Sequence, residues 1–161
     1  MITTVDLSLA VTERRATALD QDFFRRIFLA DRLPEFLGAL PPAQAETVVA
    51  DQFRLQTVGY AEAYPHASHR VVQWRGRPVG RVIDADQGSY LLVVDLVLHP
   101  DSRGIGIGTE IMRRLQAKSA ATQRPLRLSA IADSPAVRLY ESLGFRRVAE
   151  IGNRYEMEWT P

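Results

Sequence analysis

The order of apolar and polar residues in the first third of the chain predicts one strand followed by two helices. The segment Leu7–Thr17 begins with alternating apolar residues and ends in Arg14-Arg15-Ala16-Thr17, which favours a first strand. Asp20 or Asp22 can cap a following helix whose large apolar residues recur at spacings of three and four, and Pro34 should end it. Residues 43–60 repeat the helical spacing after a proline suited to the first turn. We expect no linker between these elements.

The next segment predicts three consecutive antiparallel strands. Arg70–Trp74 and Pro78–Asp84 are rich in valine and isoleucine and are joined by a turn centred on a glycine. A second turn at Asp86–Ser89 returns the chain into a third strand, Leu91–Leu98. Because this third strand is a nearly continuous apolar run, we expect it to be covered on both faces.

Asp95 interrupts the apolar run of the third strand. Burying an unpaired carboxylate costs several kcal/mol or forces a shift of its pKa. Asp95 should therefore either form an ion pair with an arginine or reach a solvated cleft, where it could bind substrate or act as a base.

A glycine-rich loop, Arg103-Gly104-Ile105-Gly106-Ile107-Gly108, follows this strand and leads into a helix that should begin near Thr109 and end before Pro125. Three glycines at alternate positions remove Cβ atoms and permit positive φ, and the first N–H groups of a helix attract anions. The spacing matches neither a dinucleotide fingerprint nor a P-loop, which needs a lysine. The loop predicts an anion site; a tight strand-to-helix turn that binds nothing stays open.

The remaining residues predict a strand, a short helix and a final hairpin. Leu126–Ala130 should run parallel to Leu91–Leu98, because a helix joins the two strands, and parallel strands whose ends diverge leave a slot for a ligand. Ser134 can cap the short helix and Gly144 can end it. Residues 146–151 and 155–159 then form the hairpin.

The composition indicates one compact soluble domain. The chain has 161 residues, 46% of them hydrophobic, a net charge of +1 and no cysteine, which excludes disulfides and thiolate metal sites. Met1–Ala10 has no basic segment before an apolar run, and no stretch is long enough to span a membrane, so we expect a cytoplasmic protein. Twenty basic residues dispersed among 19 acidic ones argue against nucleic-acid binding. His66 and His69 lack a supporting carboxylate, and we expect no metal site.

Two motifs in this order resemble the signatures of the GCN5-related N-acetyltransferases (GNAT). Arg103, Gly106 and Gly108 match the fixed positions of Gln/Arg-x-x-Gly-x-Gly/Ala. The pattern Asn-x-x-Ala-x-x-Leu-Tyr-x-x-x-Gly-Phe is matched at Ala136, Leu139, Tyr140, Gly144 and Phe145. The resemblance implies a single domain over residues 1–161, of mixed α/β (α+β) class. Its mostly antiparallel sheet of six to seven strands would be flanked by about four helices, with a parallel pair splayed around the cofactor slot.

The resemblance also implies an acyltransferase that moves an acetyl group from acetyl-CoA directly to a primary amine of a small molecule, peptide or protein. The backbone of Leu96, Val97 and Leu98 would pair with the pantetheine arm, and an N–H near Leu96 would polarise the thioester carbonyl. The N–H groups that would hold the pyrophosphate are those of Arg103, Gly104, Ile105, Gly106, Ile107, Gly108 and Thr109. Tyr140 would protonate the departing thiolate, and Asp95 is our candidate base, acting through water.

Two departures from the family pattern bear on the site. Asp133 stands where the family has asparagine, so its contact with the cofactor is weakened or turned toward the acceptor. Leu126–Ser129 lacks the glutamate that some members use as a base. A non-catalytic acyl-CoA-binding or regulatory domain and an interaction module are the alternatives. The sequence leaves open the acceptor amine, the preferred acyl chain and whether the chain forms a homodimer.

Overall fold

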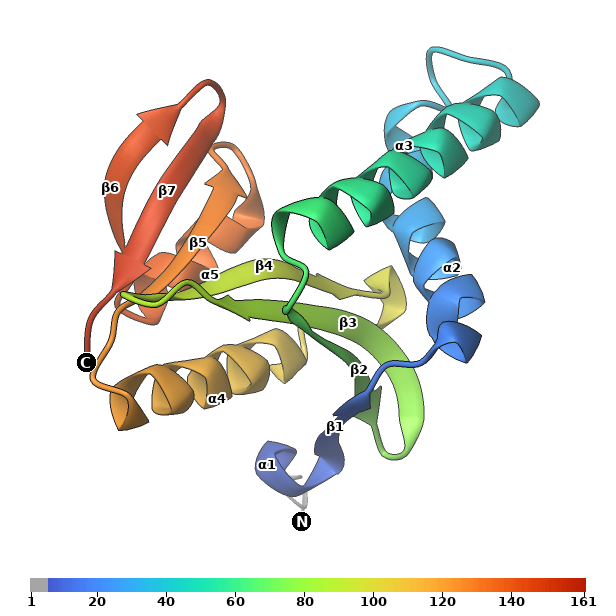
Figure 1. The fold of residues 1–161 in the computed structure, drawn as a ribbon. Coiled ribbons are helices and arrows are strands. Elements are labelled where there is room, and N and C mark those ends of the chain that lie inside the picture. Colours follow the sequence, from blue (N-terminus) through green and yellow to red (C-terminus); the bar gives the residue numbers. More distant parts are fainter. Residues whose placement is uncertain (1–5) are drawn as a thin grey trace.

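A single seven-stranded sheet organises the computed structural model, which describes residues 6–161 (Figure 1). Residues 1–5 of the segment Met1–Ala10 considered above lie outside it. The strand order is β1-β2-β3-β4-β5-β7-β6, and every neighbouring pair is antiparallel except β4 with β5. The strands are β1 (Val11–Arg15), β2 (Ser68–Trp74), β3 (Arg77–Asp86), β4 (Leu91–Leu98), β5 (Leu126–Ile131), β6 (Arg146–Ile151) and β7 (Arg154–Trp159). The predicted mixed sheet with one parallel pair is confirmed.

Helices cover both faces of this sheet (Figure 1). On one face, α2 (Gln21–Arg32) and α3 (Pro42–Ala63) enclose a core that includes Phe24, Ile27 and Val71. On the other face, α4 (Ile107–Ala121) and α5 (Pro135–Ser142) enclose the larger core around Ile111 and Met157. These four helices agree with the predicted number. Within residues 6–161, no helix combines the length and the apolar character that crossing a bilayer would require.

The first predicted strand is only partly correct. Leu7–Ala10 forms a single helical turn, α1, and the strand is confined to Val11–Arg15. The turn forms because the Asp6 carboxylate accepts a hydrogen bond of 3.0 Å from the backbone N–H of Ser8, as a helix cap does. The pattern of apolar residues does not reveal this hydrogen bond, in which an aspartate side chain favours a helical turn over an extended strand.

β4 is covered less completely than its apolar run predicts, whereas β3 is buried almost throughout. Seven consecutive residues of β3, Val79–Ala85, are buried, but only Leu91 and Val93 are buried in β4. β3 lies between two fully paired neighbours, while β4 pairs with β5 only over Leu91–Val93. The rest of β4 therefore has one neighbouring strand instead of two.

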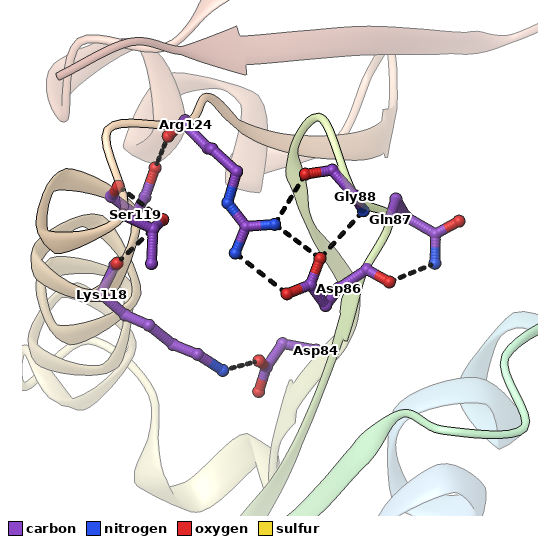
Figure 2. Close-up of polar contacts among 8 residues, drawn as sticks. Asp84, Asp86, Gln87, Gly88, Lys118, Ser119 and Arg124 are labelled. Atoms are coloured by element: carbon purple, nitrogen blue, oxygen red, sulfur yellow. Dashed lines mark hydrogen bonds and ion pairs between the residues drawn. The ribbon is translucent and has the colours of Figure 1, made fainter.

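Ion pairs tie α4 and the chain after it to the end of β3 (Figure 2). The carboxylate of Asp84, buried in β3, lies 2.5 Å from the Lys118 ammonium of α4 and 2.6 Å from the Arg70 guanidinium of β2. Asp86 accepts two hydrogen bonds from Arg124, which follows α4, and hydrogen bonding to Arg124 lowers the pKa of Asp86 to about 2. These contacts fix the far end of α4, so that its first turn is held at the opposite end of the sheet.

Asp20 precedes α2, as predicted, but its side chain does not cap that helix. Its carboxylate instead accepts hydrogen bonds from the Arg14 guanidinium, at 2.7 and 2.9 Å, and from the Thr17 N–H at 2.8 Å. The contact with Arg14 is the main reason that the pKa of Asp20 falls to about 2. Asp20 thus joins β1 to α2.

We expect Asp20→Asn to lower the free energy of unfolding at neutral pH by about 1–3 kcal/mol, because it weakens charged hydrogen bonds. A carboxyl pKa that folding lowers stabilises the protein above the unfolded value of 3.8, and this stabilisation is lost as pH falls towards 2. The two proteins should therefore converge in stability over that acid range in denaturant titrations. Asp22→Asn, two residues further along the chain and exposed, is the control; equal losses in both variants would contradict the assignment.

Candidate functional site

Six consecutive backbone N–H groups, Gly104 to Thr109, have no hydrogen-bond partner within residues 6–161. The first N–H to bond back into the helix is that of Glu110, which donates to the Gly106 carbonyl at 3.0 Å. The last three of the six open α4, a helix of 15 residues, and carry the positive end of its dipole. The loop thus collects main-chain donors that can bind an anion.

Two of the three loop glycines adopt positive φ. Gly104 has φ +78° and Gly106 has φ +95°, but Gly108 lies inside the first helical turn without a positive φ. The loop therefore uses left-handed backbone at two of its three glycines. Gly106 is the N-cap residue, so α4 begins at Ile107 rather than near Thr109. At Gly108 a Cβ would lie 3.8 Å from Leu98, an ordinary contact.

The Arg103 side chain ties this loop to the rest of the domain. Its guanidinium donates to the Leu98 carbonyl at 2.8 and 3.0 Å and forms an ion pair of 2.5 Å with Asp31 of α2. The guanidinium therefore braces the loop against β4 and α2, while the neighbouring N–H groups remain available.

β4 has an unpaired edge beside this loop. Its pairing with β5 ends at Val93, and a bulge in the β3–β4 register leaves Val94 between the pairs Asp84–Val93 and Ile83–Asp95. Since His99 donates to the Val79 carbonyl of β3 at 2.7 Å, alternation directs the backbone groups of Val97 toward β3 as well. The N–H groups of Leu96 and Leu98 then point into the gap between β4 and β5.

Asp95 forms an ion pair with an arginine, one of the two alternatives that its sequence context left open. The Arg81 guanidinium of β3, only 5% exposed, donates to Asp95 Oδ2 from Nε at 3.1 Å and from Nη2 at 2.5 Å. The same Nη2 donates to Gln56 of α3 at 2.9 Å, and the guanidinium lies over the Phe24 ring at 5.3 Å. Asp95 Oδ1 has no partner within residues 6–161, and the side chain is 20% exposed.

Tyr140 lies on α5 and packs beside the core that α4 and α5 enclose. Its ring centroid is 5.8 Å from that of Phe145. Burial, and then the charge of Asp95, raise the pKa of Tyr140 to about 12. The phenol is therefore neutral at physiological pH.

Asp133 is exposed and lies in the turn before α5. It lines a cavity of about 510 Å³ together with Ser134, Arg138 and Arg147. No residue of β4 or of the glycine loop lines this cavity. The carboxylate is thus placed beside α5 rather than with Asp95.

A family model described as an acetyltransferase (GNAT) domain matches residues 44–147. This stretch contains the loop, β4 and the tyrosine helix, and it covers more than half of the chain. The chain belongs to the GNAT acetyltransferase family. The resemblance carried by the two sequence motifs is confirmed.

Solved structures with this fold match 94–96% of this chain. PaiA N-acetyltransferase from Thermoplasma acidophilum, in complex with coenzyme A, is 13% identical with a TM-score of 0.72, over 94% of this chain and 99% of that one. An acetyltransferase from Thermus thermophilus is 21% identical, with a TM-score of 0.68 over 96% and 99%. YncA, a putative acetyltransferase from Salmonella typhimurium with acetyl-CoA, is 18% identical, with a TM-score of 0.58 over 94% of each chain. No curated protein matches the sequence.

The fold brings three further polar residues of this GNAT domain to Asp95. Arg81 and Gln56 form the hydrogen-bonded chain described above, and Tyr60 lies one helical turn beyond Gln56 on α3. Burial, and then the charge of Asp95, raise the pKa of Tyr60 to about 12. Sequence reasoning missed all three. The available signal was Arg81 itself, a charge in the middle of an apolar strand that complements Asp95.

The loop geometry makes a stability prediction for two matched glycine variants. Gly106→Ala should lower the free energy of unfolding by about 1–2 kcal/mol, because an L residue at φ +95° is strained and its Cβ would lie 2.8 Å from the Leu7 side chain. Gly108→Ala should change it little. Chemical denaturation of both variants measures the difference; equal stability would show that the left-handed N-cap is not required.

Proposed function

We propose that this domain transfers an acetyl group from acetyl-CoA directly to a primary amine in a ternary complex. The observation that carries the proposal is the row of N–H groups from Gly104 to Thr109 that lack partners in the described residues. It stands at the start of α4 and close in sequence to the unpaired edge of β4. Family membership and the coenzyme A and acetyl-CoA bound by similar structures support the same conclusion.

The donors of the loop fit a pyrophosphate. They are uncharged main-chain N–H groups, the kind that many helix N-termini use to bind phosphate. A Cβ at Gly104 would meet nothing within 4 Å, so a phosphate can approach the backbone there. Leu96 and Leu98 offer the strand-like donors that an extended amide arm can bind. When bound, acetyl-CoA supplies the thioester carbonyl that the amine attacks.

Leu96 and Asp95 are adjacent residues with complementary roles in this proposal. The Leu96 N–H serves as the oxyanion donor, an interaction worth about 100–1000-fold in rate in acyl-transfer enzymes. The Asp95 oxygen that Arg81 leaves unbonded accepts the proton of the incoming ammonium, directly or through water. A base is required because an amine with a pKa of about 10.4 is neutral in fewer than about one molecule in a thousand at neutral pH.

Tyr140 acts on the leaving sulfur. A pKa of about 12 lies well above the value of about 8.5 for a free thiol, so complete proton transfer to the thiolate is uphill by about 5 kcal/mol. Tyr140 therefore stabilises the thiolate chiefly by donating a hydrogen bond. Its neutral form is the active one, and burial preserves that form across the physiological range.

Thermal unfolding with acetyl-CoA tests the cofactor assignment. Ligand at about a hundred times its dissociation constant adds roughly 2.7 kcal/mol, which should raise Tm by about 5–10 °C. Gly108→Val adds a branched side chain in the first turn of α4, at the proposed pyrophosphate site, and should remove most of this rise in Tm. Gly152→Ala, strained by its φ of +60° in a distant turn, should keep it. A folded wild-type protein with no shift would overturn the proposal; a shift without thiol release from any amine would favour a non-catalytic acyl-CoA-binding domain.

Tyr140→Phe should lower kcat about tenfold to a hundredfold by a factor that stays constant between about pH 7 and 10, because the wild-type phenol does not ionise there. Burial favours the protonated phenol, so Tyr140 loses its proton only at a higher pH than a free tyrosine does. A pH series of kcat, followed by release of free thiol, measures this. If the ratio of the two rates fell steadily with rising pH, Tyr140 would be ionising and its assigned role would be wrong.

A further inference from the structure

Asp95 and Arg81 present one carboxylate oxygen to the gap. Both Arg81 donors bind Oδ2, and Gln56 and the Phe24 ring fix the guanidinium from α3 and α2. Oδ1 therefore has a defined orientation and no partner within the described residues. An ammonium group that reaches this oxygen lies next to Leu96, the residue that follows Asp95 in the chain.

Arg154 provides a positive charge on the other side of the same gap. It opens β7 opposite Ile131, and its Nε and Nη2 donate to the hydroxyl and the carbonyl of Ser129 at 2.9 Å each. Ser129 is the first residue of β5 beyond the three that pair with β4. Its neighbours Leu128 and Ala130 point into the core under α4 and α5, so Ser129 and the exposed Arg154 lie on the opposite face of the sheet, the face on which α2 and α3 pack. Arg154 Nη1 has no partner in residues 6–161, and no carboxylate there lies within ion-pair distance of Arg154.

Tyr60 of α3 is a third polar group on this side of the sheet. It lies four residues after Gln56, so both side chains project from the same side of the helix, and Gln56 accepts a hydrogen bond from the Arg81 guanidinium that binds Asp95. The Tyr60 hydroxyl has no hydrogen-bond partner among the described residues. Burial is the main cause that raises the pKa of Tyr60 to about 12, and the charges of Asp95, Arg81, Arg154 and Tyr64 also act on it.

We propose that the acceptor is an amine that also carries a carboxylate, such as a free amino acid, bound with its ammonium at Asp95 and its carboxylate at Arg154 and Tyr60. A guanidinium with a free N–H and a phenol hydroxyl form a site for a carboxylate oxygen, and Asp95 Oδ1 is the complementary site for the amine. This inference rests on the acetyl-transfer function proposed above and names its acceptor class. Glu156, on the same face of β7, would instead favour a second cation, so a diamine belongs in the test.

The experiment measures binding of acceptors to the domain saturated with coenzyme A, by calorimetry, so that it does not depend on turnover. The probes are L-amino acids, the corresponding L-amino acid amides, which lack only the carboxylate charge, and diaminobutane. The wild-type domain should bind at least one amino acid about tenfold or more tightly than its amide. Arg154→Gln should abolish this preference, and Arg154→Glu should reverse it in favour of diaminobutane.

Two further variants make the result specific. Asp95→Asn should weaken amino acid and amide alike, because it alters the shared ammonium contact. Arg146→Gln removes an exposed arginine from edge strand β6, farther from the gap, and should leave the preference intact. Equal binding of acid and amide to the wild type, tighter binding of the diamine, or a preference that survives Arg154→Gln would overturn the inference. Failure of the acetyl-transfer proposal has a different signature, since bound acceptor would then release no thiol from acetyl-CoA.

Discussion

The separation of β4 from β5 is the constraint on which the site depends. These two strands share only three residue pairs, and the bulge at Val94 turns the rest of β4 away. In a regular strand without the bulge, residues two apart share a face, so Asp95 would lie on the same face as Val93, in the apolar core under α4 and α5. The bulge therefore does two things at once: it opens one edge of β4 and moves a carboxylate to the face covered by α2 and α3.

A polar group at that position requires compensation, and Arg81 provides it. The guanidinium is buried among Phe24, Gln56 and Asp95, so neither charge is left unpaired in a region of low dielectric. Arg81 of β3 binds both Asp95 of β4 and Gln56 of α3. The position of α3 is therefore coupled to the orientation of the Asp95 carboxylate. The site is thus supported by the same contacts that join the helical layer to the sheet.

Local signals predicted much of this fold from the sequence. The glycine turns, the proline before α3 and the cap at Ser134 act within a few residues, and the corresponding elements were found close to their expected bounds. The sequence also indicated that Asp95 needs either an arginine partner or a solvated cleft. It could not select Arg81 among 19 arginines, because that choice follows from strand register. The helical turn α1, the bulge at Val94 and the approach of Arg154 to the gap are likewise set by contacts between distant segments.

Lys118, described above as the partner of buried Asp84, is the only lysine in the chain. All other basic side chains except the histidines are guanidinium groups, which are not acceptors for an enzyme that acylates primary amines. The single lysine ammonium is held against a carboxylate at the C-terminal end of α4, far along that helix from the glycine loop (Figure 2). For the proposed transfer of acetyl groups to primary amines, a domain of this composition offers almost no side-chain amine that could compete with an external acceptor.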